Sequence, residues 1–429
     1  MLRARQRAGV RRVLTIEGPV TWIAGALYVV VGRWLVATRA RATAAAFAVL
    51  NVAAVSAFFL SWAGHIVVPV AVVYLSLVLA QYVALRVETR TDGRFPWVAF
   101  LLPITALVVA RWMPVSVLAR FGVVIRAAIE QTPAATLASY LVGLSYLAFR
   151  TSHLVLDVRN GVVPPPNVWE YLGFAFFAPT LAVGPINPYS NYRRAFAEGD
   201  RPDIPSSRAL MRVVVGLVKF KFLGPLCDQL AYSGLLLDTH PHHWIDLPVA
   251  AVAYYLYLYC NFSGACDVAI GVAGLIGIPV AENFDRPFAA RNVRDFWNRW
   301  HITLTNYMRD VVFSPLSRWL VRVGGAARAN HAIAVAIVVV FLLVGVWHGV
   351  GWNYLAFGAL HALGVTVNHY YGIALKRRLG KERFAAYGRS PWIRAAAVSL
   401  TFVYIAGTLF VFANSPDAMH RIFTSLRSN

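Results

Sequence analysis

The chain has 429 residues, of which 59% are hydrophobic and only 14% are charged. This balance, with a mean hydropathy of +0.58, excludes an ordinary soluble domain and indicates a multi-pass membrane protein. The 40 Lys and Arg residues against 19 Asp and Glu give a net charge of +21. Because the basic residues interrupt apolar stretches and do not form a solvated domain, nucleic acid is not an expected partner.

Apolar stretches long enough to cross a bilayer recur along the whole chain. Each crossing needs about 20 apolar residues. The candidate spans are 19–37, 43–62, 65–86, 96–112, 134–156, 169–186, 208–230, 247–276, 331–349, 351–372 and 392–414. Pro103, Pro179 and Pro225 lie inside such stretches, and broken helices at membrane depth are tolerated only where protein or a watery cavity covers the backbone. We therefore predict an all-α, polytopic integral membrane protein with about 11 transmembrane helices around a central funnel or tunnel.

The segments between the spans predict topology and surface elements. Five arginines, from Arg3 to Arg12, precede the first span and predict a cytoplasmic N-terminus. That span is followed by further spans, as expected of an uncleaved chain. The stretch 187–206 is rich in proline and turn residues and predicts a loop. The stretch 292–320 has apolar residues at helical spacing among arginines, which predicts interfacial or re-entrant helices.

The organisation along the chain is that of one membrane-embedded domain, 1–429. Residues 1–130 are mainly scaffold spans, and from about residue 137 polar residues crowd into the apolar segments. The three cysteines are an odd number without the spacing of a metal site, so we expect no metal. We expect the protein in the plasma (inner) membrane of the cell.

Two histidines in apolar sequence are the strongest functional signal. His348 ends an almost purely aliphatic run, 333–346, and His301 ends the aromatic run Arg294–His301. A buried imidazole must be either hydrogen-bonded or used for chemistry. A helix-capping or packing role for His348, and an interfacial role for His301, are the alternatives.

Three motifs around these histidines resemble a known family. Glu282–Phe288, Asp295–Leu304 and Gly345–Gly349 are similar to the signature of the membrane-bound O-acyltransferases. The bacterial branch of this family, with the alginate O-acetylase and the teichoic acid D-alanyl transferase, is the most similar. The resemblance covers about 137–415. Where the family commonly has Asp-Phe-Ser-Gly-Tyr-Ser-Asp, this chain has Asn261-Phe-Ser-Gly-Ala-Cys-Asp267, which leaves the acceptor open.

The resemblance implies that His348 is the catalytic residue and that His301 is the second motif histidine. Acyl transfer from a thioester to a hydroxyl needs a base and a hydrogen-bond donor to the oxyanion. A neutral imidazole can be that base, so we expect His348 to take the proton and His301 to orient the acyl donor or stabilise the oxyanion. Further candidates for the substrate site or tunnel are Asn298, Arg299, Trp300, Trp347, Asn353, Ser263 and Lys219.

Several of these candidates also have a purely structural interpretation. Trp300 and Trp347 are of a type that often anchors helices at the membrane interface. Lys219 can extend toward a lipid headgroup. His361 lies outside the motifs, and a packing role is expected for it. No Ser or Cys nucleophile elbow is visible, so direct attack by the acceptor hydroxyl is the simplest mechanism.

The expected function is therefore O-acyl transfer, with acetyl as the favoured group and D-alanyl transfer to teichoic acid or a similar polymer as the alternative. A proton-coupled transporter and a structural scaffold are alternatives of other classes. No bound cofactor is expected. The co-substrate is an acyl thioester of coenzyme A or an acyl carrier protein. The basic face, with Arg291, Arg294 and Arg299, can recruit this anionic donor. The other expected partners are lipids and an extracytoplasmic acceptor or partner acyltransferase.

Overall fold

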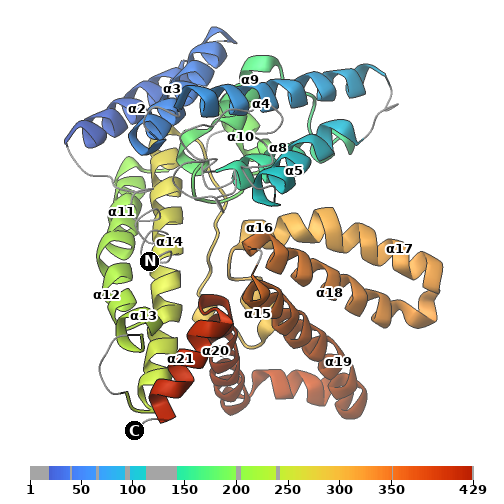
Figure 1. Cartoon of the computed structure of the whole chain (residues 1–429). Helices are drawn as coiled ribbons and strands as arrows, with labels where there is room; N and C mark the ends of the chain where they lie inside the picture. The colour runs from blue at the N-terminus through green and yellow to red at the C-terminus, as the bar shows by residue number, and fades with distance from the viewer. Residues whose placement is uncertain are drawn as a thin grey trace. The chain divides into compact units, whose positions relative to one another are not determined.

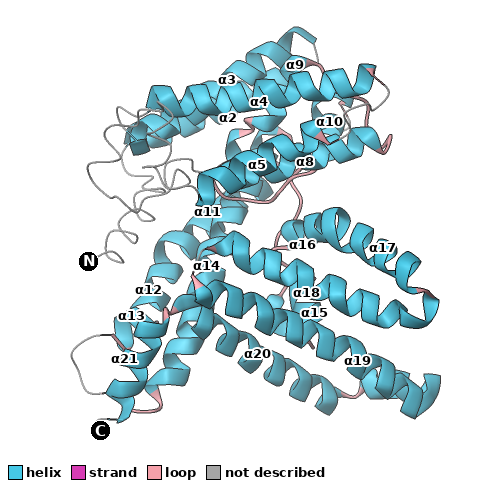
Figure 2. Ribbon diagram, turned by 45° about the vertical axis from the view of Figure 1, so that its right-hand side comes forward, coloured by secondary structure: helices cyan, strands magenta, loops and turns pink. Residues whose placement is uncertain are grey.

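The computed structural model describes residues 19–38, 41–63, 67–91, 97–112, 143–199, 204–237, 242–349 and 351–427. Within these ranges the chain forms helices and loops, and no strand forms beyond one isolated bridge (Figure 2). The all-α prediction is confirmed for this part of the chain. The arginines that precede the first span lie outside the described residues.

Among the described residues, five helical stretches are long and apolar enough to cross a membrane. They are Val20–Ala37, Val72–Arg90, Asp246–Ile276, Ala326–His348 and Pro391–Ala413. Each overlaps a predicted span. The count of eleven spans, and the funnel or tunnel, stay predictions.

The chain divides into two compact units. The first unit contains the described residues of Met1–Val214 with Asp267–Ala281, and the second contains those of Val215–Cys266 with Glu282–Asn429. The expected single domain 1–429, with scaffold in 1–130 and the catalytic region in 137–415, stays a prediction.

The first unit is built on helices α2 to α10 and parts of α11 and α14. Their bounds are α2 Pro19–Ala37, α3 Arg41–Ala63, α4 Val67–Arg90, α5 Val98–Trp112, α8 Leu144–Arg159, α9 Val168–Ala175, α10 Tyr189–Arg193, α11 Ser206–Leu217 and α14 Asp246–Ile276. Buried Gln81 joins three of them, because its Nε2 donates to the carbonyl of Ala99 at 3.0 Å and its Oε1 accepts from the Tyr171 hydroxyl at 2.7 Å. Such a satisfied amide fixes the mutual position of α4, α5 and α9.

The predicted span 169–186 is wrong. Helix α9 begins after Asn167, whose side chain accepts from the amides of Trp169 and Glu170, and it ends at Ala175. Pro179 then lies in a short 3-10 turn, Ala178–Thr180. Proline has no backbone N–H to donate, so the helix does not continue through Pro179. The eight-residue α9 is too short to cross a bilayer.

The predictions for the two long stretches between spans, 187–206 and 292–320, agree with the structure to different degrees. The stretch 187–206, predicted as a loop, contains α10 and a π-helical turn, Arg194–Glu198. The helices predicted in 292–320 are confirmed as α15 Val293–Trp297, α16 Ile302–Met308 and the start of α17 Ser314–Gly324. Their interfacial position stays a prediction.

The second unit holds the motifs. Besides α15 to α17 and the first part of α14, it contains the π-helical turn Val218–Leu223, α12 Gly224–Gln229, α13 Tyr232–Leu235, α18 Ala329–His348, α19 Trp352–Arg389, α20 Pro391–Ala413 and α21 Pro416–Arg427. Helices α18 and α19 run side by side (Figure 1). They approach closely at two glycines, since a Cβ on Gly358 would lie 2.4 Å from the Phe341 carbonyl and one on Gly345 would lie 2.5 Å from the Tyr354 carbonyl. This contact holds the end of α18, and therefore His348, against α19.

We predict that Gly358→Ala separates α18 from α19. The added methyl group meets backbone, which cannot move aside as a side chain can, and overpacking of this kind costs about 1–3 kcal/mol. The midpoint of thermal unfolding in detergent should therefore fall. Gly407→Ala on α20 is the matched control, because its Cβ would meet nothing within 4 Å. Equal unfolding midpoints for the two variants would contradict the close approach.

Candidate active site

A short antiparallel contact fixes the backbone around His301. The amide of Ile302 donates to the Asn283 carbonyl at 3.0 Å, and the amide of Asp285 donates to the Arg299 carbonyl at 3.0 Å. His301 itself precedes α16 in the left-handed region, with φ 47°. A non-glycine residue in that region carries strain that its surroundings must compensate. The pairing with Asn283 and Asp285 supplies that compensation and sets the direction of the imidazole.

The side chain of Asn283 determines which nitrogen of His301 carries the proton. Its Oδ1 accepts from the amide of Thr303 at 3.1 Å and from the Thr303 hydroxyl at 2.9 Å, and its Nδ2 donates to the Cys266 thiol sulfur at 3.3 Å. A backbone amide can only donate, so the amide orientation of Asn283 is settled. Nδ1 of His301 lies 3.2 Å from the same Oδ1. It must therefore donate, and Nε2 of the neutral ring is left with a lone pair.

That Nε2 atom is buried and unsatisfied. It has no hydrogen-bond partner among the described residues, and the His301 side chain is only 4% exposed. The ring packs edge-on against Phe262 at 4.7 Å between ring centres. Burial, and in second place the nearby His348, lower the pKa of His301 to about 3, so the ring is neutral near pH 7. An unsatisfied buried acceptor in a native structure calls for a partner, which is an ordered water or a bound ligand, or for a functional role.

His348 is the last residue of α18 and is half-buried among aromatic rings. Its ring centre lies 5.0 Å from that of Phe412, 5.8 Å from that of Phe357 and 6.5 Å from that of Tyr354. Trp347 connects the two histidines, with ring centres 4.6 Å from His348 and 6.3 Å from His301. The two predicted catalytic histidines thus belong to one aromatic cluster in the second unit.

His361 is a third buried histidine with a different environment. The indole of Trp297 donates to its Nδ1 at 3.0 Å, and its Nε2 lies 3.0 Å from the Thr408 hydroxyl, which in turn donates to the Ile405 carbonyl. Tryptophan has no acceptor, so Nδ1 accepts and Nε2 donates. Both nitrogens are satisfied, and the side chain joins α15, α19 and α20. The expected packing role fits this geometry.

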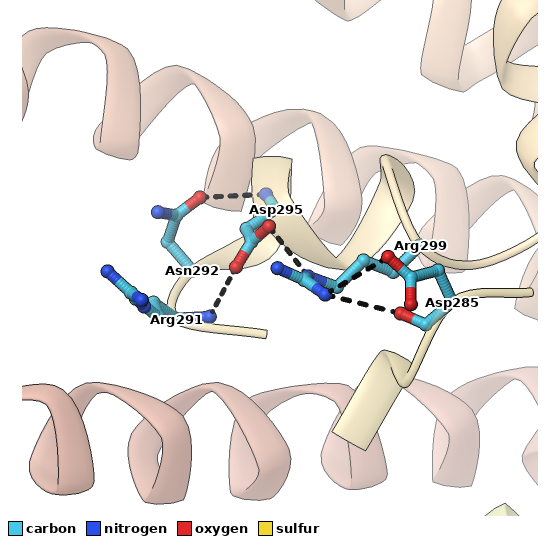
Figure 3. A network of polar contacts seen from close by, with 5 residues as sticks. All are labelled: Asp285, Arg291, Asn292, Asp295 and Arg299. Atoms are coloured by element: carbon cyan, nitrogen blue, oxygen red, sulfur yellow. Dashed lines mark hydrogen bonds and ion pairs between the residues drawn. The ribbon is translucent and has the colours of Figure 1, made fainter. Parts of the chain in front are cut away.

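Arg299, predicted to meet the donor, is paired with two carboxylates (Figure 3). Its Nε donates to Asp295 Oδ1 at 2.8 Å, and its guanidinium reaches Asp285 Oδ2 at 3.5 Å. Asp295 also accepts from the backbone amide of Arg291 at 2.9 Å, and the side chain of Asn292 caps α15 by accepting from the Asp295 amide. The network indicates that Arg299 orders the motif. A role in donor binding stays a prediction.

The remaining candidates lie in the same unit with different surroundings. Trp300 is buried and stacks on Phe296 at 5.5 Å between ring centres. Lys219 Nζ lies 5.5 Å from the centre of the Tyr259 ring. Ser263 is 2% exposed, and its Oγ has no hydrogen-bond partner in the described part of the chain. Asn353 donates to the Phe412 carbonyl at 2.9 Å, and Asn298 is exposed at the end of α15.

Sequence reasoning missed Asn283. It lies inside the quoted motif Glu282–Phe288, but its importance depends on a pairing with Thr303, 20 positions later. An asparagine four residues before a turn that begins with Pro287 resembles many loop residues. The only available signal was its place in a motif whose partner motif carries His301.

Comparison with known proteins identifies the region that holds these residues. The sequence model of MBOAT, the membrane-bound O-acyltransferase family, matches residues 62–411. The match includes all the candidate residues of the site.

Characterised relatives fall into two groups by name. A teichoic acid D-alanyltransferase of Streptococcus thermophilus is 30% identical over 288 residues, which are 63% of this chain and 68% of the relative. A peptidoglycan O-acetyltransferase of Helicobacter pylori is 29% identical over 254 residues, 58% of this chain and 45% of the relative. The probable alginate O-acetylase AlgI of Pseudomonas aeruginosa is 27% identical over 235 residues, 54% and 43%. The chain spans less than half the length of these two acetylases. All three names are of acyl-transferring proteins, and the transporter and scaffold alternatives are not favoured.

We predict that Arg299→Met destabilises the protein more than Arg294→Met does. The first change leaves Asp295 and Asp285 without their cation, at a cost of about 1 kcal/mol. Arg294 is exposed, and its guanidinium lies 3.3 Å from Nδ1 of the His369 ring and not beside these carboxylates, so it is the control. The midpoints of thermal unfolding of the two variants in detergent give the comparison. The same loss in both would show that the carboxylate pairing does not order the motif.

Proposed function

Because the chain belongs to the membrane-bound O-acyltransferase family and is an acyltransferase, we propose that it transfers an acyl group from a cytoplasmic thioester to a hydroxyl group on the far side of the plasma membrane. The acceptor is a cell-envelope polysaccharide or a partner protein that passes the group on. The observation that carries the proposal is the aromatic cluster of His301, Trp347 and His348 inside the family region.

The reaction needs no bound cofactor. The acceptor hydroxyl oxygen attacks the thioester carbonyl, a C–O bond forms, and the C–S bond breaks. The hydroxyl proton passes to an imidazole and then to the departing thiolate sulfur, so that an ester and a free thiol are produced. The donor is the thioester of coenzyme A or of an acyl carrier protein.

Helix position distinguishes the two imidazoles as proton acceptors. His348 is the last residue of the 20-residue α18, and His301 immediately precedes α16. A cation is stabilised at a helix C-terminus and disfavoured at an N-terminus, by about 0.3–1 kcal/mol in each case. We therefore assign proton transfer to His348 and keep His301 neutral throughout the reaction.

Acetyl is the acyl group that we propose first. The rings around His348 are those of Trp347, Tyr354, Phe357 and Phe412. An uncharged acetyl group can be buried among them without leaving a charge unpaired. A D-alanyl group carries an ammonium, whose loss of hydration the same rings would have to offset through cation–π contacts.

D-alanyl transfer is the second candidate, and a specific observation favours it. The two D-alanyltransferases of Streptococcus thermophilus and Bacillus subtilis match this chain over 68% and 72% of their own lengths. The acetylases match over 45% and 43% of theirs. A shared extent of chain suggests a shared architecture and leaves the acyl group to be measured.

The deciding experiment reconstitutes the purified protein in vesicles and offers radiolabelled acetyl-coenzyme A or a D-alanyl carrier protein to a panel of polysaccharide acceptors. Incorporation from acetyl-coenzyme A alone supports the first proposal, and incorporation from the carrier alone supports the second. Incorporation from neither, with every acceptor offered, would contradict the proposed reaction. The His348→Ala protein provides the background in each assay.

We predict that His348→Ala lowers turnover by about two to four orders of magnitude while insertion and folding persist. The loss falls on turnover because the imidazole acts in the transition state. Single-turnover rates, normalised to protein that elutes as a folded peak, give the measurement. A folded variant with near-normal transfer would exclude His348 as the proton acceptor.

We also predict that the double reversal Arg291→Glu, Arg294→Glu raises the Michaelis constant for the donor more than it lowers turnover. Both side chains are exposed beside the motif, and the donor carries phosphates. The effect should weaken with added salt, since charges are screened over about 8 Å at physiological ionic strength. Arg389→Glu, an exposed arginine at the end of α19, is the control. Donor affinity that does not respond to either salt or the reversal would leave membrane topology as the reason for the net charge.

A further inference from the structure

The buried Nε2 of His301 is a hydrogen-bond acceptor to which no described residue donates. Asn283 holds the ring proton on Nδ1, and Nε2 has no partner among the described residues. A bound molecule that satisfies Nε2 must therefore bring an N–H or O–H group. The neutral ring in this tautomer has no proton on Nε2 to offer to an oxyanion.

The chemistry of the proposed reaction limits which group this can be. An acetyl group has no hydrogen-bond donor, and the thioester offers only its oxygen and sulfur. The acceptor hydroxyl has one proton, which the proposed mechanism sends to His348. Within the thioester donor itself, the hydrogen-bond donor nearest the reacting carbon is the first amide N–H of the pantetheine arm, two carbons from the sulfur. Unreacted hydroxyls of a polysaccharide acceptor are the competing source of an O–H group. Coenzyme A and carrier proteins share this arm.

We propose that Nε2 of His301 accepts a hydrogen bond from the pantetheine amide nearest the thioester, and that Asn283 is the positioning residue that fixes the tautomer for this contact. The inference rests on the proposed thioester donor. In this arrangement the apolar ethylene link between sulfur and amide lies among the rings around His301. Their centres are 4.7 Å from that of the His301 ring for Phe262 and 6.3 Å for Trp347. The inference replaces oxyanion stabilisation by Nε2 of His301 with donor positioning.

The hydrogen-bonding properties of the neutral imidazole match those of an amide N–H. A neutral ring with a depressed pKa is a weak base but still a hydrogen-bond acceptor, and an amide N–H does not transfer its proton. A site built for a hydrogen bond discriminates strongly against an analogue without the donor, because its own polar atom is then left unpaired. The protein should therefore select the pantetheine arm through a hydrogen bond to Nε2 of His301.

The test is a binding comparison that does not require turnover. Two unreactive ligands are titrated into the purified full-length protein by calorimetry: S-acetonyl-phosphopantetheine, whose extra methylene blocks transfer, and its analogue with an ester oxygen in place of the first amide N–H. The wild type should bind the amide about 10-fold or more tightly than the ester. In His301→Phe and in Asn283→Leu the ratio should fall to nearly one.

Two variants separate positioning from general loss of structure. Asn283→Asp keeps an oxygen that accepts from Thr303 and His301. It should retain the preference for the amide at a pH above the pKa of the imidazole, which the new carboxylate raises. Asn187→Leu removes a buried asparagine with a comparable set of bonds, to Ala281, Pro279 and Asn191, but without a histidine partner. It should keep the wild-type ratio even if it lowers stability.

Nitrogen NMR of the histidine-labelled protein provides a second readout if a variant does not fold. The wild-type spectrum should show a protonated Nδ1 and an unprotonated Nε2 for the resonance pair that disappears in His301→Phe. An unprotonated Nδ1, or equal affinity of the wild type for amide and ester, would overturn the proposal. If acyl transfer fails but the preference for the amide is intact, the proposed reaction alone is refuted. If the protein prefers D-alanyl over propionyl thioethers and shows no preference for the arm amide, the N–H donor is on the acyl group and the inference is overturned.

Discussion

The hydrogen bond from the Thr303 amide to Asn283 Oδ1, at 3.1 Å, is the constraint on which the site depends. It is a bond from a backbone donor, so its direction cannot reverse. Through it the asparagine amide is oriented, the proton of His301 is held on Nδ1, and the lone pair of Nε2 is left in an apolar environment. Because the motif around residue 283 also pairs by backbone with residues 299–302, the same contact positions the imidazole and defines its chemistry.

Burial alone does not separate a structural histidine from a functional one. His301 and His361 are exposed by 4% and 0% and both pack among aromatic rings. His361 has a partner on each nitrogen, supplied by Trp297 and Thr408, and its bonds leave nothing for a substrate. His301 has a partner on one nitrogen only. The unsatisfied Nε2 atom therefore distinguishes His301 from His361, whose burial is similar.

Much of the fold followed from hydrophobic length, whereas the site did not. The runs 19–37, 247–276 and 392–414 were predictable because about 20 apolar residues in helical conformation cross a bilayer wherever they occur. The stretch 169–186 is also rich in apolar residues, but Pro179 divides it, and overall composition carries no information on where a helix ends. The pair His301 and His348 was visible as motifs. The contact of Arg299 with Asp295 has the i,i+4 spacing of a helix and lies within one motif. The roles of Asn283 and Asp285 were not visible, because contacts between segments 14 to 20 residues apart have no local sequence pattern.

His348 lies at the C-terminus of one helix and His301 at the N-terminus of another. The backbone dipoles of these helix ends therefore favour a positive charge on the first histidine and disfavour it on the second. An imidazolium at His348 is favoured by the C-terminus of α18, while one at His301 is disfavoured by the start of α16 and by burial. In the proposed mechanism, a single proton on the pair is therefore assigned to His348. If the roles were exchanged, the reaction would have to form a cation at the N-terminus of a helix and in the more buried position. The asymmetry of the two helix ends is thus the basis on which the proposed mechanism gives different parts to two residues of the same type, which both contact Trp347.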